Sequence, residues 1–176
     1  MGHELRDTAR QTAVTNPYMD SSLTGLESAA PMNRAAQTFV IPVRVYYEDT
    51  DSGGVVYYAN YLKFFERCRT EYLRAIGHHQ ADLLRDPGIA FVVRSASVDY
   101  LKPARLDDQL LVGLEIERLS HAQIFFRQYI RRADATLAGD RADLVRARIH
   151  VVCVNSALMK ATAIPSFLRT KLEAMQ

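Results

Sequence analysis

The sequence predicts an α+β fold in which one long helix lies against an antiparallel sheet of about five strands. Three observations lead to this prediction: a helical period in residues 57–76, strand-like segments before and after it, and short links between the later strands. A single long amphipathic helix needs a large apolar surface to cover, and a sheet of this size provides one. We therefore expect a long central helix wrapped by the sheet.

Five segments have the composition of strands. The first, residues 38–47 (TFVIPVRVYY), is β-branched and aromatic, and Pro42 within it favours an edge position or a bulge. The others follow the helix and are residues 89–101, 110–119, 124–132 and 145–155. The link at residues 120–122 is short enough for a hairpin. Strands joined in this way pair in antiparallel fashion.

The long helix is predicted from the spacing of its apolar residues. They recur at steps of 4, 3, 4 and 4 at positions Tyr61, Phe65, Cys68, Tyr72 and Ile76. Charged residues fall mostly on the opposite face, and Gly77 directly after the pattern is a typical C-terminal stop. Residues 165–175 (PSFLRTKLEAM) predict a short amphipathic helix at the end of the chain.

Composition divides the chain into two parts. Residues 1–37 are rich in Ser, Thr, Ala, Asn and Gln without a sustained period, which predicts a flexible N-terminal extension. Residues 38–176 form the predicted domain, which is long enough to bury a core. The net charge is +2 and basic residues are interspersed with acidic ones, so we expect no nucleic-acid partner.

The cysteine pattern excludes two further classes of protein. Cys68 and Cys153 lie in apolar patterns, and neither has a Cys or His at ligand spacing. This excludes a disulfide scaffold and a Cys-based zinc site, and we expect no metal and no cofactor.

The longest apolar runs have about five residues, far below the roughly 20 of a membrane helix. We therefore expect no transmembrane segment and a cytoplasmic location.

Candidate chemistry is concentrated between the first strand and the long helix. Three acids and a glycine pair fall there, at Glu48, Asp49, Asp51, Gly53 and Gly54. Glycine allows close approach of a substrate, and the first turn of a helix presents N–H groups that can stabilise a developing oxyanion. A carboxylate beside such donors suits acyl transfer. The same residue types are also typical of helix caps and loop turns, so the residues alone leave both interpretations open.

A family resemblance favours the catalytic interpretation. Residues 43–73 read VRVYYEDTDSGGVVYYANYLKFFERCRTEYL. This segment resembles the signature of the hotdog-fold acyl-CoA thioesterases, most closely the 4-hydroxybenzoyl-CoA thioesterase and YbgC (Tol-Pal-associated) branch. A weaker likeness extends over about residues 38–170. The resemblance implies a hotdog fold, with the sheet around the helix, and hydrolysis of an acyl-CoA thioester.

The resemblance also implies a role for each matching residue. Asp51 becomes the catalytic carboxylate, which either attacks the thioester carbonyl or activates water. The backbone N–H of Tyr58 becomes the donor to the thioester oxygen, with Gly54 and Val55 shaping the approach. Many YbgC-type members have His at the position of Tyr58, whereas the 4-hydroxybenzoyl-CoA enzyme has Tyr. The acyl group, short-chain or aromatic, is therefore left open.

The implied substrate is an acyl-CoA and the implied assembly a homodimer or homotetramer, because this family builds its sites at subunit interfaces. Acyl carrier protein is a further candidate partner. A site for the CoA phosphates is needed as well. Arg and Lys suit phosphate, and we expect Lys102 and Arg118 to contact it.

Two other functions compete with the thioesterase. A dehydratase or hydratase on the same fold needs a histidine beside the acid, but none of the five histidines lies within 25 residues of Asp51. The alternative is a non-catalytic acyl-CoA or acyl-carrier-protein binding protein of the cell-envelope machinery. Release of thiol from an acyl-CoA distinguishes the thioesterase from this binding protein.

Overall fold

The computed structural model describes residues 38–134 and 142–175. The elements follow in the order β1 (Phe39–Arg44), the short 3-10 helix η1 (Tyr47–Asp49), α1 (Asn60–Ala75), α2 (Gln80–Arg85), β2 (Ile89–Tyr100), β3 (Gln109–Leu119), β4 (Gln123–Arg132), β5 (Asp143–Asn155), β6 (Lys160–Ala161) and α3 (Ser166–Glu173). The predicted flexible extension, residues 1–37, lies outside the described residues and stays a prediction.

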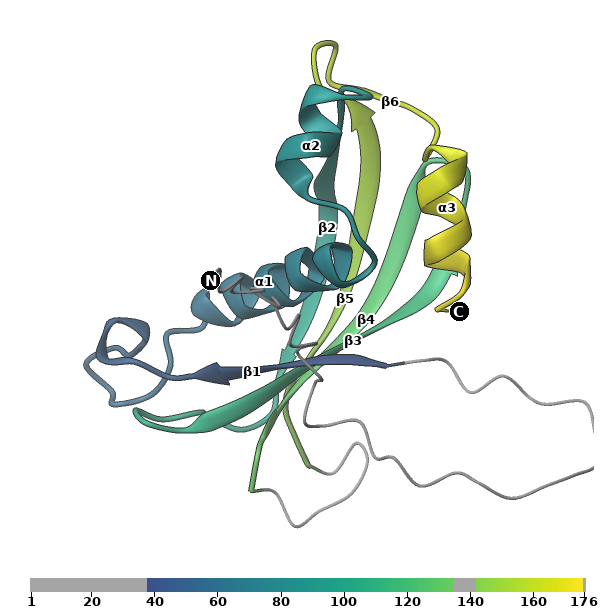
Figure 1. Ribbon diagram of the computed structural model, residues 1–176. Helices are drawn as coiled ribbons and strands as arrows, with labels where there is room; N and C mark the ends of the chain where they lie inside the picture. Colours follow the sequence, from purple (N-terminus) through teal and green to yellow (C-terminus); the bar gives the residue numbers. More distant parts are fainter. Residues whose placement is uncertain (1–37, 135–141, 176) are drawn as a thin grey trace, which may run out of the picture. The chain divides into compact units, whose positions relative to one another are not determined.

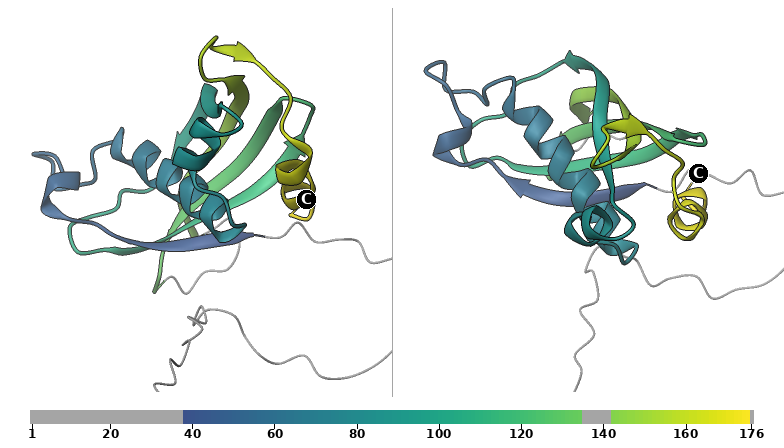
Figure 2. Two further views of the ribbon diagram at one scale, coloured as in Figure 1. Left: turned by 45° about the horizontal axis from the view of Figure 1, so that its top comes forward. Right: turned by 90° about the horizontal axis from the view of Figure 1, so that it is seen from above.

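One antiparallel sheet forms the larger part of the fold. Its strand order is β1–β3–β4–β5–β2, and β6 adds a short pair to β5. The sheet curls around α1, as the views in Figures 1 and 2 show together. The predicted α+β arrangement of one long helix and about five antiparallel strands is confirmed. β1 is an edge strand, as Pro42 favours, and Pro42 stands opposite Leu111.

The core lies between α1 and the inner face of the sheet. Phe64, Phe65 and Cys68 of α1 are fully buried, and the sheet adds inward side chains that alternate along the strands, such as Leu110, Val112, Leu114, Ile130 and Ile149. Both cysteines are buried and free, as expected from their apolar surroundings. Burial raises the pKa of the Cys68 thiol to about 12, so this group is protonated at neutral pH and is not a nucleophile.

One polar residue is buried between α1 and β4. The side chain of Gln128 has no exposed surface. Its Nε2 donates to the carbonyl of Phe65 at 3.1 Å, and its Oε1 accepts from Arg69 at 2.7 Å. Because both ends of the amide are bonded, its burial carries little penalty. Gln128 therefore ties α1 to the sheet.

The helix α1 begins later than predicted and ends where predicted. The apolar period suggested a start at Tyr57, but the helix begins at Asn60. The amide of Tyr57 donates to the carbonyl of Asp49 at 2.9 Å, which holds this residue in the preceding loop. At the other end, Gly77 has φ of 87° and donates to the carbonyl of Arg74 at 2.8 Å. Among the described helices, none is long and apolar enough to cross a membrane.

Candidate active site

Asp51 lies in a small loop that is closed by backbone hydrogen bonds. Its amide donates to the carbonyl of Val55, and the amide of Gly54 donates to the carbonyl of Asp51, both at 3.0 Å. Gly54 has φ of 70°, a left-handed conformation that favours glycine. A Cβ at Gly53 would lie 3.0 Å from Oδ1 of Asp51. The two glycines therefore differ in purpose: Gly54 turns the chain, and Gly53 leaves room beside the carboxylate.

The carboxylate of Asp51 is exposed and oriented by its own loop. Its Oδ1 accepts the backbone N–H of Gly53 at 2.8 Å. In the described part of the chain, no arginine or lysine forms an ion pair with it. The neighbouring Asp49 is different, because its side chain is buried and its Oδ2 accepts the amide of Tyr46 at 2.9 Å. Asp51 is therefore the acid of this segment that combines exposure with a fixed orientation.

Tyr58 lies in the turn that precedes α1. The amide of Asn60 closes this turn by donating to the carbonyl of Tyr57 at 2.8 Å. The carbonyl of Tyr58 accepts the hydroxyl of Tyr100 at 3.2 Å. No acceptor among residues 38–134 and 142–175 bonds the amide of Tyr58. This N–H is therefore free to donate to a substrate oxygen.

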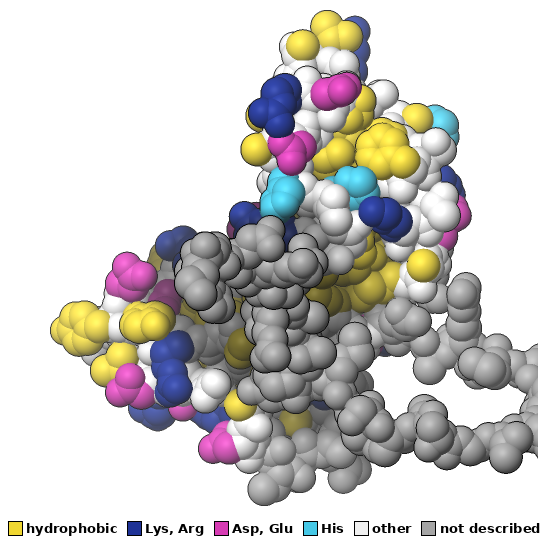
Figure 3. All heavy atoms as spheres, in the orientation of Figure 1, with side chains coloured by type: hydrophobic (Ala, Val, Ile, Leu, Met, Phe, Trp, Pro, Cys, Tyr) yellow, Lys and Arg dark blue, Asp and Glu magenta, His cyan; other side chains and the backbone are white. Residues whose placement is uncertain are grey.

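A cavity of about 250 Å³ lies beside Tyr58. It is lined by Val56, Tyr58, Tyr61, Tyr100, Leu101, Lys102 and Pro103. Hydrophobic side chains lie exposed at this end of the molecule, on the left in Figure 3. The hydrogen bond and charge of Tyr58 raise the pKa of Tyr57, and Asp51 adds a smaller effect in the same direction. The Asp51 carboxylate is thus close enough to Tyr57, the residue before Tyr58, to affect its ionisation.

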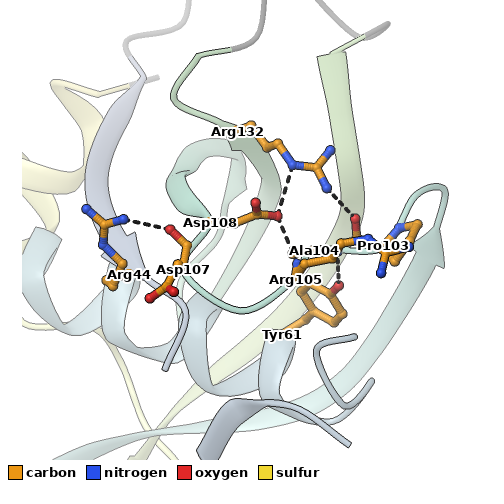
Figure 4. Close-up of polar contacts among 8 residues, drawn as sticks. All are labelled: Arg44, Tyr61, Pro103, Ala104, Arg105, Asp107, Asp108 and Arg132. Carbon is orange, nitrogen blue, oxygen red and sulfur yellow. Dashed lines mark hydrogen bonds and ion pairs between the residues drawn. The ribbon is translucent and has the colours of Figure 1, made fainter. Parts of the chain in front are cut away.

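The far wall of this cavity is the loop between β2 and β3. The hydroxyl of Tyr61 accepts the amide of Ala104 at 2.9 Å, and the carbonyl of Ala104 accepts the amide of Val56 at the same distance. Farther along the loop, the carboxylate of Asp108 pairs with Arg132 at 2.9 Å (Figure 4). These bonds fix the wall against both α1 and the loop of Asp51.

The structure brings one of the two predicted phosphate contacts to the cavity. Lys102 lines it, whereas Arg118 lies toward the other end of β3, with its guanidinium 3.7 Å from the ring centroid of Phe125. The Asp51 loop adjoins the start of β3, where Arg44 pairs with Gln109. At about 3.3 Å per residue, Gln109 and Arg118 are about 30 Å apart. Within one chain, Arg118 is therefore remote from Asp51.

Two residues of the site were not anticipated from the sequence. Tyr100 stands 42 positions from Tyr58, and no local pattern signals a contact at that separation. Asn60 is buried next to the apolar face of α1. Its polar side chain beside the apolar pattern could have been recognised from the sequence. Within residues 38–134 and 142–175, no three His, Cys, Asp or Glu side chains are grouped so as to hold a metal ion.

A curled sheet around a central helix, with an acid in the loop before that helix, defines a hotdog-fold protein of the thioesterase type. Residues 53–138 match the family model described as the thioesterase superfamily. The acyl-CoA thioesterase YbgC of Haemophilus influenzae is 46% identical over 127 residues, which are 72% of this chain and 88% of that protein. The YbgC enzyme of Helicobacter pylori is 36% identical over 134 residues, 75% and 98% of the two chains.

Solved structures agree with this assignment. A probable thioesterase from Bartonella henselae has a TM-score of 0.65 at 34% identity and covers 73% of this chain and 99% of its own. A 1,4-dihydroxy-2-naphthoyl-CoA thioesterase from Synechocystis has a TM-score of 0.68 at 27% identity, with 77% and 95% covered. The chain belongs to the thioesterase superfamily and, within it, to the acyl-CoA thioesterases of the YbgC type. The predicted family, hotdog fold and enzyme class are confirmed.

Proposed function

We propose that Asp51 and the amide of Tyr58 form the reaction centre of this acyl-CoA thioesterase. The observation that carries the proposal is their arrangement: an exposed, oriented carboxylate and an amide without an acceptor among the described residues lie at the two ends of one hydrogen-bonded loop. A thioester carbonyl between them would meet an attacking group on one side and a donor on the other. One such donor is typically worth about 10² to 10³ in rate.

The reaction follows from these two groups. The N–H of Tyr58 donates to the thioester oxygen and stabilises the negative charge that develops there. In one route, Asp51 takes a proton from water while the water oxygen bonds to the carbonyl carbon; in the other, a carboxylate oxygen of Asp51 forms that bond itself. In both, the C–S bond then breaks and CoA leaves as the thiol, taking its proton from Asp51 in the first route and from water in the second. The second route leaves the acyl group on Asp51 as an anhydride, which water hydrolyses to release the acid and restore the carboxylate.

The substrate we propose is a short-chain or aromatic acyl-CoA. Four of the seven residues that line the cavity beside Tyr58 are Tyr or Leu, which suits a small apolar or flat acyl group. Lys102 on the same cavity offers a positive charge for the CoA phosphates. A contact from Arg118 would have to come from another subunit, because of its distance from Asp51 along β3. The position of Gly54 and Val55 in the loop supports their proposed role in shaping the approach.

The test of this function is the release of thiol from a panel of short-chain, long-chain and aromatic acyl-CoAs. We expect turnover of short-chain or aromatic members, with a lower kcat/KM for long chains, because the cavity is small. Thiol can be followed continuously with a disulfide reagent. Failure to release thiol from any member would overturn the proposal and leave the binding-protein alternative.

We further propose a homodimer or homotetramer built on the edge strand β2. Residues 93–97 of this strand are exposed in succession, and an uncovered edge offers unpaired N–H and C=O groups to a second copy. The expected result is a solution mass of at least about twice that of the chain, measured by light scattering after size exclusion. A monomer at micromolar concentration would contradict this.

A cytoplasmic location, a link to Tol-Pal and acyl carrier protein as a partner stay predictions.

A further inference from the structure

Asn60 joins the two halves of the proposed reaction centre. It is the first residue of α1, and only 6% of it is exposed. Its side-chain Nδ2 donates to the carbonyl of Asp49 at 3.0 Å, and its backbone N–H donates to the carbonyl of Tyr57 at 2.8 Å. The carbonyl of Asp49 also accepts the amide of Tyr57 at 2.9 Å. One residue thus holds both the segment that leads to Asp51 and the turn that contains Tyr58.

The backbone bond from Asn60 fixes the direction of the proposed oxyanion donor. The carbonyl of Tyr57 and the N–H of Tyr58 belong to the same peptide unit, which is planar and trans, so they point in opposite directions. Because the carbonyl is held toward the start of α1 by Asn60, the N–H is turned away from the helix. The bond from Asn60 to the Tyr57 carbonyl thereby orients the Tyr58 N–H and leaves that N–H without an acceptor among the described residues.

The side-chain bond from Asn60 fixes the position of the carboxylate. Asp51 follows Asp49 by two residues, and its loop is closed on itself by the bonds to Val55 and Gly54. The loop therefore moves as a unit, and the carbonyl of Asp49 is where Asn60 attaches it to the helix. A misplacement of about 1 Å at a reaction centre can cost about 10² in rate.

The side chain of Asn60 does not cap the helix α1. Asn often caps a helix by accepting from its first N–H groups, yet the N-cap of α1 is Ala59 and no side chain caps this end. A buried amide is costly unless it is bonded, and Asn60 uses its donor on the loop. We infer that Asn60 is a positioning residue that sets the separation between the Asp51 carboxylate and the Tyr58 N–H. This inference rests on the proposed function.

The test uses Asn60→Ala and the near-isosteric Asn60→Asp, whose carboxylate cannot donate to the Asp49 carbonyl. We expect kcat for thiol release to fall about 10- to 100-fold in both, with little change in KM, because the binding cavity is retained. Should Asn60→Ala fail to fold, Asn60→Asp takes its place in the kinetic test. A kcat within about two-fold of the wild type in folded variants would overturn the inference.

Gln128→Ala is the matched control. Gln128 is likewise buried and likewise donates to a backbone carbonyl of the α1 region, that of Phe65, but it lies away from the Asp51 loop. We expect it to lower Tm while kcat stays near that of the wild type. An equal loss of kcat in Gln128→Ala and Asn60→Ala at equal Tm would show that Asn60 acts only through stability, which overturns the inference.

A double variant separates this inference from the proposed function. If Asn60 acts by placing Asp51, Asn60→Ala should cause no further loss in an Asp51→Asn background. Additive losses would overturn the inference while the role of Asp51 stands. If Asp51→Asn keeps full activity, the proposed function itself is wrong. The two failures are therefore distinguishable.

Discussion

Replacing Asp51 by Asn is expected to lower kcat for thiol release by about 10² to 10⁴, the scale for losing a positioned base or nucleophile. The amide of Asn neither attacks a carbonyl nor takes a proton from water. It still offers an oxygen to the N–H of Gly53, so the loop keeps its shape and KM should change little. Steady-state kinetics on the best substrate of the acyl-CoA panel measure both constants.

Glu48→Gln is the matched control for this experiment. It removes one negative charge three positions away, from an exposed side chain in the same segment. We expect its kcat to stay near that of the wild type, because the effect depends on the place of the carboxylate and not on the net charge. Full activity in Asp51→Asn, or equal losses in the two variants, would contradict the assignment of Asp51.

The largest expected loss of stability is that of Phe65→Ala. The ring of Phe65 is fully buried between α1 and the sheet. Its removal leaves a cavity and also reduces the apolar surface that is buried on folding. Phe→Ala changes of this kind cost about 3–5 kcal/mol of unfolding free energy. For a domain of this size, Tm should fall by about 10 °C or more. Denaturant titration and thermal scans measure the two quantities.

Leu62→Ala on the same helix provides the comparison. Leu62 is 38% exposed, so truncation removes less buried surface and leaves no closed cavity. We expect a loss of no more than about 1 kcal/mol. Equal losses in the two variants would mean that the packing of α1 against the sheet is not the main source of its stability.

Sequence patterns predicted the elements with strong periodicity and missed those without it. The strands and α1 bury one face along many residues, which produces repeats of 2 and 3.6. The helix α2 has six residues and buries only Leu83, so it leaves no period to detect. The start of α1 was misplaced because a tertiary bond between Tyr57 and Asp49 decides it, and apolar spacing does not report such a bond.

The same limit applies to the site. Asp51, Gly54 and Tyr58 lie within one short segment, so a local motif was sufficient to select them. Lys102 and Arg118 were selected by charge alone, and charge carries no information about which end of the sheet a residue occupies. The register of β1 on β3 places the Asp51 loop at one end of β3 and leaves Arg118 toward the other. Contacts of this range depend on the whole sheet.

The loop that holds Asp51 is shaped chiefly by bonds between backbone groups. Its amide and carbonyl contacts with Val55, Gly54 and Tyr57 use none of their side chains. Of the side chains that line the nearby cavity, those of residues 100–103 come from a separate segment of the chain. Side-chain mutations in that separate segment therefore leave the backbone bonds of the Asp51 loop in place. Under the proposed function, acyl-group preference is free to change in evolution through that segment while the residues proposed for hydrolysis stay the same.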